Sequence, residues 1–219
     1  MKSPYCKYVL AATLAATTVA YVAQVPANAA VPFTDLKNVG DHYTAIEELY
    51  NSSIITGRTA TTFAPYEAAT RAELALFIAN ALHLDTKNVK DPGFTDVPKN
   101  STYYGAIAAL YNEGIIGGYK DQTFKPNDPV KRSQVAKMLV LAFDLELANT
   151  TTTKFTDVNS IADVNTRRYI QTLVQYNITK GTSATTFSPS DSVKRAQLAT
   201  FLKRAMDYTQ SDFDIINVE

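Results

Sequence analysis

The stretch Phe33-Thr34-Asp35-Leu36 decides the fold, because the chain repeats it as Phe94-Thr95-Asp96-Val97 and as Phe155-Thr156-Asp157-Val158. The three copies are evenly spaced along the chain. Two further landmarks follow every copy in the same order: a segment that contains Ile and ends in Gly, and a Thr-Phe-x-Pro element. These glycines are Gly57, Gly118 and Gly181, and the Thr-Phe-x-Pro elements begin at Thr62, Thr123 and Thr186. Three sets of landmarks in one register indicate a repeat protein of three units.

The third unit is slightly longer than the other two. Its Thr-Phe-x-Pro element begins two positions later than the spacing between Thr62 and Thr123 predicts. This difference places a short insertion between Val158 and Ile170.

Each unit predicts two helices separated by a loop. An apolar face with the spacing i, i+3, i+4 follows the Phe-Thr-Asp turn, and a longer face that extends to i+8 follows the Thr-Phe-x-Pro element. The first face is Ile46, Leu49 and Tyr50, then Ile107, Leu110 and Tyr111, then Ile170, Leu173 and Val174; the second begins at Leu74, Val135 and Leu198. We therefore predict an all-α protein of three tandem helix-loop-helix repeats. Their apolar faces should pack on one another, because a pair of helices this short is near the lower limit for folding alone.

Residues 1–29 have the features of a signal peptide. Lys2 and Lys7 supply a positive charge, an apolar run extends from Tyr8 to about Val22, and small residues precede a cleavage site after Ala29. The alternative is a membrane-spanning helix, which needs about 20 apolar residues and is therefore longer than this run. On this prediction the mature chain loses Cys6, its one cysteine. An exported protein without disulfides is more typical of bacterial surfaces than of small secreted eukaryotic domains.

The charge balance excludes a dedicated nucleic-acid-binding protein. The chain has 21 Lys and Arg against 21 Asp and Glu, so its formal net charge is zero. Two of the basic residues lie in the leader, which leaves a mature chain of net charge −2. Binding to nucleic acid needs an excess of positive charge on one face.

Three motifs together resemble the S-layer homology domain. They are Phe-Thr-Asp-Val, the loop Gly118-Tyr119-Lys120-Asp121-Gln122-Thr123-Phe124-Lys125-Pro126, and Thr70-Arg71-Ala72-Glu73 at the start of the second helix. The resemblance covers roughly residues 31–208, nearly the whole mature chain. It divides the protein into a signal peptide (1–29), repeats 1 (30–91), 2 (92–152) and 3 (153–208), and a short acidic tail (209–219).

The resemblance implies a monomeric, three-pronged helical bundle with pseudo-threefold symmetry, secreted to the wall or S-layer of a Gram-positive bacterium. Domains of this family hold surface proteins non-covalently to an anionic, pyruvylated secondary cell-wall polysaccharide. The resemblance also implies that grooves between neighbouring repeats take the sugar, and that the motif arginine meets the pyruvate carboxylate. In this chain those arginines are Arg71, Arg132 and Arg195.

The helix starts that carry these arginines are unusual in charge. Thr70 and Glu73 predict a capping box, but the other two copies have Lys131 and Lys194 at the cap position. Lysine is a poor cap, and cations at the positive end of a helix dipole cost about 0.3–1 kcal/mol each. A bound anion would offset that cost, because free N–H groups beside an arginine fork form a carboxylate or phosphate site. We therefore predict that the three arginines and two lysines bind the polysaccharide. The alternatives are solvated basic side chains, or arginines that bridge to an Asp of the neighbouring repeat.

Three further sets of residues are candidates for the same sites. Asp35, Asp96 and Asp157 are predicted to cap the short helix or stiffen a turn, and alternatively to accept sugar hydroxyls. Gly57, Gly118 and Gly181 are predicted to have positive φ and also to leave bare backbone for a sugar. Tyr119 offers an aromatic face to a sugar, or packs half-buried with its hydroxyl in water.

The residues give no pattern of a catalytic centre. His42 and His83 have no counterparts in the other repeats and no Ser or Cys partner pattern, and the acids form no pair for glycoside hydrolysis. Asp121-Gln122-Thr123 lacks the further acids of a calcium loop. We predict a non-enzymatic anchor without a metal or other cofactor. Two alternatives remain open: a module that binds another protein at the cell surface, and direct binding to peptidoglycan.

Overall fold

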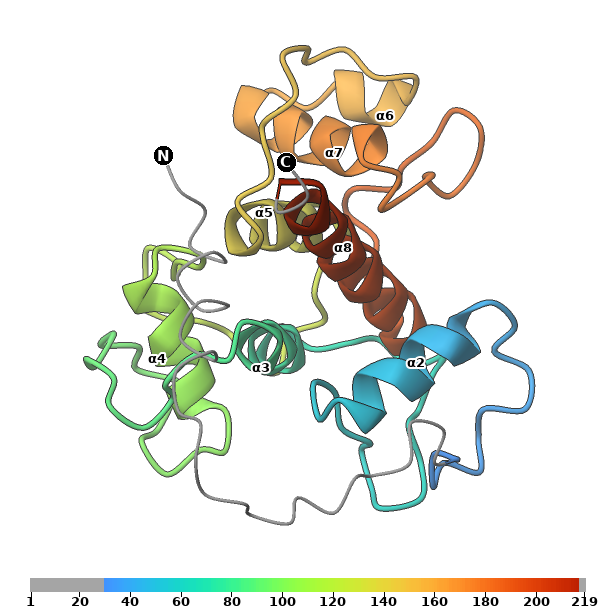
Figure 1. Ribbon diagram of the computed structural model, residues 1–219. Coiled ribbons are helices and arrows are strands. Elements are labelled where there is room, and N and C mark those ends of the chain that lie inside the picture. Colours follow the sequence, from blue (N-terminus) through green and yellow to red (C-terminus); the bar gives the residue numbers. More distant parts are fainter. Residues whose placement is uncertain (1–29, 217–219) are drawn as a thin grey trace.

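The chain folds into helices joined by long loops in the computed structural model, which describes residues 30–216 (Figure 1). The helices of this range are α2 (His42–Asn51), α3 (Arg71–Ala81), α4 (Tyr104–Asn112), α5 (Arg132–Ala142), α6 (Thr156–Asn159), α7 (Val164–Gln175) and α8 (Arg195–Ile216). Within the same range there is no β-strand, only three isolated β-bridges. The all-α prediction is confirmed. The predicted signal peptide lies outside the described residues.

The helices pair between repeats rather than within them. The second helix of repeat 1, α3, packs against α4 of repeat 2, and α5 of repeat 2 packs against α7 of repeat 3. Repeat 3 closes the circle, because α8 packs against α2 of repeat 1. Figure 1 shows the three pairs arranged around a common centre. The repeat in sequence is therefore not the packing unit, since each prong is built from two repeats.

A ring of backbone hydrogen bonds lies where the three repeats meet. Ala69 N–H donates to the carbonyl of Val193, Val193 to that of Val130, and Val130 to that of Ala69, over 2.8, 3.0 and 2.9 Å. All three residues are fully buried. Each lies two residues before the arginine that begins α3, α5 or α8. The ring therefore fixes the three helix starts against one another.

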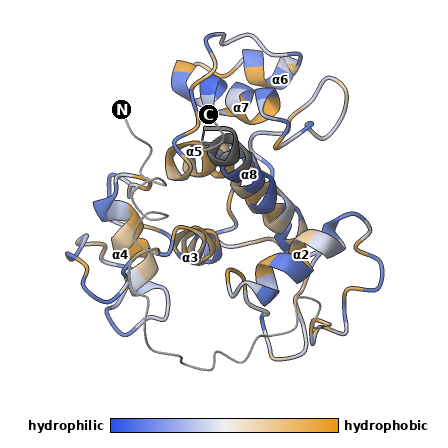
Figure 2. Ribbon diagram, viewed as in Figure 1, coloured by the Kyte–Doolittle hydropathy of each residue, from blue (hydrophilic) through white to orange (hydrophobic). Residues whose placement is uncertain are grey.

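The apolar faces predicted from the sequence form one continuous core. Ile46, Leu49, Leu74 and Phe77 are at most 1% exposed, and their counterparts in the other repeats join the same cluster. Nine of the eleven residues of α3 are buried, so this helix is enclosed on nearly all sides. Figure 2 shows the α3 ribbon largely in the hydrophobic colours. The segment predicted as a tail begins inside α8, which continues to Ile216. None of the helices in residues 30–216 combines the length and the apolar composition that crossing a bilayer requires.

The glycine of each repeat serves the Phe-Thr-Asp motif. A Cβ atom at Gly57, Gly118 or Gly181 would collide with the ring of Phe33, Phe94 or Phe155, respectively. The prediction of positive φ is confirmed for Gly181, at +86°, and is wrong for Gly57 and Gly118. At those two positions glycine is needed because the motif phenylalanine lies against the backbone.

The aspartate of the motif fastens the Thr-Phe-x-Pro loop of its own repeat. Both carboxylate oxygens of Asp35 accept backbone N–H groups, from Phe63 at 2.9 Å and Ala64 at 2.7 Å. Asp96 and Asp157 make the same pair of bonds in the other repeats. The prediction that these residues cap the short helix is wrong, whereas their stiffening of a turn is confirmed. The carboxylates hold residues Ala64, Lys125 and Ser188, which have left-handed φ of 59–60°.

The close approach of Phe94 to Gly118 yields a stability prediction. Replacing Gly118 by alanine is expected to lower the free energy of unfolding by about 1–3 kcal/mol, because the new methyl group overpacks the site. The adjacent Gly117 is a matched control, since a Cβ atom there meets nothing within 4 Å. Urea denaturation followed by circular dichroism measures both variants. Equal stability of Gly118→Ala and Gly117→Ala would contradict this packing role.

Candidate functional site

The three motif arginines lie between repeats, and each reaches into the loop of another one. The Nε atoms of Arg71, Arg132 and Arg195 donate to the carbonyls of Phe124, Phe187 and Phe63 over 2.8, 2.8 and 2.7 Å. Each guanidinium also lies over the ring of the same phenylalanine, at 4.5–4.8 Å from the ring centre. The predicted alternative, in which the arginines bridge to a neighbouring repeat, is therefore correct about the repeat that they contact. It is wrong about the acceptor, because the Nε atoms donate to backbone carbonyls rather than to an Asp.

The amides at the helix starts already have partners. The N–H groups of Arg71 and Ala72 donate to the carbonyls of Asp128 and Pro126, and α5 and α8 repeat this arrangement. The prediction of free N–H groups at these sites is therefore wrong. Any anion bound here would be held by side chains, because the backbone donors of the first turn are occupied by a neighbouring repeat.

Arg71 lines a groove whose charge is entirely positive. We call it the Arg71 groove; its volume is about 170 Å³ and its lining is Arg71, Ile115, Ile116, Gly117, Gly118, Tyr119, Gln134, Lys137 and Met138. The Nη atoms of Arg71 have no hydrogen-bond partner among the described residues. Lys137 adds a second cation, and no carboxylate lies in the lining. The groove therefore contains the Nη atoms of Arg71, which have no hydrogen-bond partner there, and the ammonium group of Lys137.

Tyr119 is the exposed aromatic side chain of this groove. It is 39% exposed, and its ring lies 5.2 Å from the Arg71 guanidinium carbon and 4.4 Å from Lys125 Nζ. Its hydroxyl accepts a hydrogen bond from Gln134 Nε2 at 3.1 Å. Three residues that the sequence named as separate candidates, Arg71, Gly118 and Tyr119, therefore lie in one groove.

Burial weakens the hydration of these arginines without removing their charge. Burial lowers the pKa of Arg71, while Tyr119, Asp128 and Asp96 act in the opposite direction. Burial likewise lowers the pKa of Arg132 and Arg195. Arginine is not deprotonated in proteins, so the groups keep their charge at physiological pH. A partly desolvated cation without a counterion favours the binding of an anion.

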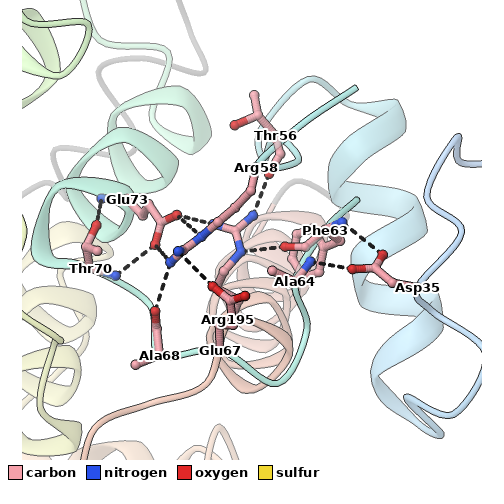
Figure 3. Close-up of polar contacts among 10 residues, drawn as sticks. All are labelled: Asp35, Thr56, Arg58, Phe63, Ala64, Glu67, Ala68, Thr70, Glu73 and Arg195. Atoms are coloured by element: carbon pink, nitrogen blue, oxygen red, sulfur yellow. Dashed lines mark hydrogen bonds and ion pairs between the residues drawn. The ribbon is translucent and has the colours of Figure 1, made fainter. Parts of the chain in front are cut away.

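Arg195 is engaged within the protein. It is 1% exposed, and its Nη1 atom donates to Glu73 Oε1 at 2.5 Å, while Nη2 donates to the carbonyl of Thr56 at 2.7 Å. Figure 3 shows contacts from the Glu73 carboxylate to both Arg195 and Arg58. The neighbouring groove, which we call the Glu73 groove, is lined by Thr56, Gly57, Arg58, Thr70, Glu73, Leu76, Phe77, Tyr103 and Asn127.

The Nη atoms of Arg132 are less engaged within the protein than those of Arg195 and more engaged than those of Arg71. It is 4% exposed, and its Nη2 atom makes one long hydrogen bond, of 3.4 Å, to Thr179 Oγ1. Its guanidinium carbon lies 5.3 Å from the centre of the Phe201 ring. The predicted residue Gly181 lies next to this contact, because its N–H donates to the same Thr179 hydroxyl over 3.4 Å.

The two predicted lysines lie outside both grooves. Lys131 and Lys194 are exposed, and their backbone N–H groups donate to Oε1 of Gln134 and Gln197, respectively. Glutamine thus performs half of the capping box that Thr70 and Glu73 complete in repeat 1. The sequence prediction missed Lys137 instead. Its place three residues after Gln134, on the same side of a helix, was the signal that could have found it.

The remaining predicted residues divide between the grooves and the loops. Gly118 lines the Arg71 groove and Gly57 lines the Glu73 groove. Both carboxylate oxygens of each motif aspartate accept N–H groups of a loop, so these residues position the loops rather than line the grooves. They are Asp35, Asp96 and Asp157.

Comparison with known proteins agrees with this geometry. The S-layer homology domain matches residues 32–75, 93–136 and 154–199. The chain belongs to the S-layer homology family.

Three relatives show the range of proteins that contain such a segment. The surface-layer 125 kDa protein of Lysinibacillus sphaericus is 30% identical over 94% of this chain and 18% of that protein. An endoglucanase of Bacillus sp. (strain KSM-635) is 36% identical over 52% of this chain and 12% of the enzyme. The cellulosome-anchoring protein of Acetivibrio thermocellus is 29% identical over 66% of this chain and 33% of that protein. The chain thus spans about a third or less of each of these relatives.

The different engagement of the arginines predicts different losses of stability. Arg195→Ala is expected to lower the free energy of unfolding by about 3–5 kcal/mol, because it leaves buried Glu73 without one of its cations. Arg71→Ala removes one hydrogen bond of a charged group and is expected to cost about 1–3 kcal/mol. Urea denaturation measures both, with exposed Lys120→Ala as the control, expected to change stability by less than about 0.5 kcal/mol. A loss for Arg71→Ala as large as that for Arg195→Ala would contradict the difference.

Proposed function

We propose that the protein is a non-catalytic anchor at the bacterial cell surface that binds an anionic, pyruvylated secondary cell-wall polysaccharide. The observation that carries the proposal is the Arg71 groove, where Arg71 and Lys137 converge and no carboxylate is present. A cationic ligand would be repelled by these two charges, and a neutral one would gain only ordinary hydrogen bonds from them. An acidic ligand would form charge-assisted hydrogen bonds with them, each contributing about 1.5–3 kcal/mol.

The other groups of the groove suit a sugar. Gly117 and Gly118 leave backbone without side chains, and Tyr119 exposes an aromatic face to the same space. A pyruvate ketal places one compact carboxylate on a sugar ring. One carboxylate matches the Nη atoms of Arg71 and the ammonium group of Lys137 better than an extended row of negative charges would. A polymer that engages more than one groove of the same molecule would gain affinity through effective concentration.

The relatives support an attachment role. A surface-layer protein, an endoglucanase and a cellulosome-anchoring protein differ in what their names say they do, yet each contains a segment similar to this one. The segment covers only 12% of the endoglucanase. A shared segment of this kind is better explained by attachment to the cell surface than by a common reaction.

The proposal is tested by the binding of the purified protein to cell-wall sacculi. We expect retention on intact sacculi and loss of retention once the secondary polysaccharide has been extracted with hydrofluoric acid, which leaves peptidoglycan. Retention on the extracted sacculi would contradict the proposal and favour direct peptidoglycan binding. Binding only to sacculi that keep their surface proteins would favour a protein partner.

A single side chain tests the groove within the same assay. Lys137→Ala is expected to weaken binding to intact sacculi by about tenfold or more, because it removes one charge-assisted bond. Lys137 is exposed, so the fold should be unaffected. Lys87→Ala is the matched control, since Lys87 is also exposed and lines neither groove. Equal binding of the two variants would remove the Arg71 groove from the proposal.

A further inference from the structure

We infer that the inter-repeat sites are not equivalent: the Arg71 groove is open to an anionic ligand, whereas the cations beside the Glu73 groove are already paired with the protein's own carboxylate. This inference rests on the proposed function and adds which groove performs it. It follows from one position in the repeat. Glu73 of repeat 1 is in register with Gln134 of repeat 2 and Gln197 of repeat 3.

Glu73 is saturated with donors. Its Oε1 atom accepts from Arg195 Nη1 at 2.5 Å and Arg58 Nε at 3.1 Å. Its Oε2 atom accepts from Arg58 Nη2 at 3.2 Å and from the Thr70 backbone N–H at 2.8 Å. The side chain is 9% exposed. A carboxylate held by two guanidinium groups is the arrangement expected of a bound acidic ligand. The Glu73 carboxylate therefore makes the contacts that a ligand carboxylate would make (Figure 3).

The charge around Glu73 is also balanced. Arg58 pairs with Glu67 at 2.9 Å in addition to Glu73, so Arg58 and Arg195 meet two carboxylates. The local sum is zero. A further anion would have to displace Glu73 from partners that it holds at no cost in translational entropy, because it belongs to the same chain.

The Arg71 groove differs from the Glu73 groove at three positions of the repeat register. Gln134 replaces Glu73, Tyr119 replaces Arg58, and Lys137 replaces Leu76 in the repeat register. The Gln134 amide bonds to the Lys131 N–H and to the Tyr119 hydroxyl, so it leaves Arg71 alone. Arg71 is 6% exposed, and its Nη atoms have no acceptor among residues 30–210, whose side chains the structure describes. A partly desolvated guanidinium that makes no ion pair with a described carboxylate is therefore available in this groove.

The inference is tested with a small soluble probe, the methyl glycoside of a hexosamine that bears a 4,6-pyruvate ketal. In ¹H–¹⁵N correlation spectra of the wild-type protein, the probe is expected to shift the backbone amides of Gly117, Gly118 and Tyr119. The amides of Thr56, Gly57 and Arg58 should remain in place. Shifts of both sets at the same probe concentration would overturn the inference, and so would an absence of shifts at Gly117 and Gly118.

Reciprocal exchanges between the grooves sharpen the test. Glu73→Gln, Arg58→Tyr and Leu76→Lys together reproduce the Arg71 groove at the Glu73 position. We expect the Thr56 and Gly57 amides to shift with the probe and the calorimetric stoichiometry to rise by one site. Gln134→Glu with Tyr119→Arg is expected to weaken binding at Gly117 and Gly118 at least tenfold. Unchanged stoichiometry in a folded triple variant would overturn the inference.

The two hypotheses fail in different assays. Sacculi that bind the protein equally well without polysaccharide would overturn the proposed function. Polysaccharide-dependent binding together with shifts in both grooves would preserve the proposed function and overturn only the non-equivalence. Because the wild-type spectra need no substitution, the inference stays testable even where the triple variant does not fold.

Discussion

The hydrogen-bonded ring of Ala69, Val130 and Val193 determines how the rest of the structure is arranged. It brings the starts of α3, α5 and α8 to one centre, and each start then lies against the loop of a neighbouring repeat. The first amides of each helix bond to that loop, and the arginine at the helix start bonds to its phenylalanine carbonyl. A single repeat would leave these donors and acceptors unpaired. The fold therefore depends on three repeats that close on themselves, with α8 packed against α2.

The same crossing forms the grooves that we propose as binding sites, so the fold and the proposed function share the motif arginine. Its Nε atom and ring contact serve the fold, and only its Nη atoms are left for a ligand. For Arg195 and Arg71, what the Nη atoms meet depends on the third residue of a neighbouring helix. Glutamic acid completes the capping box of α3 and pairs with Arg195; glutamine at Gln134 supports the cap of α5 and leaves Arg71 unpaired. One capping residue thus decides whether the adjacent groove carries a free positive charge.

Much of the fold could be predicted from local patterns. The spacing of Ile46 and Leu49, and of Leu74 and Phe77, located the helices because burial of one helical face leaves a period of about 3.6 residues. The pairing of α3 with α4 could not be read from that period, which identifies a buried face but not its partner. The contact partners of the motif glycines and aspartates could not be predicted for a related reason. They depend on contacts between residues that are distant in the sequence, such as Gly57 with Phe33.

For the site, the sequence identified the arginines but not their surroundings. Arg71, Arg132 and Arg195 are identical in register, yet their Nη atoms differ in what they meet. Within residues 30–210 those of Arg71 have no acceptor, whereas Arg132 meets Thr179 and Arg195 meets Glu73. Because Arg71 is held at Nε by Phe124 and stacked on its ring, the guanidinium is already oriented before any ligand arrives. Little side-chain entropy remains to be lost on binding, so even a single carboxylate can be bound effectively there. A flexible lysine at this position would supply the charge but neither the orientation nor the bond that joins the repeats.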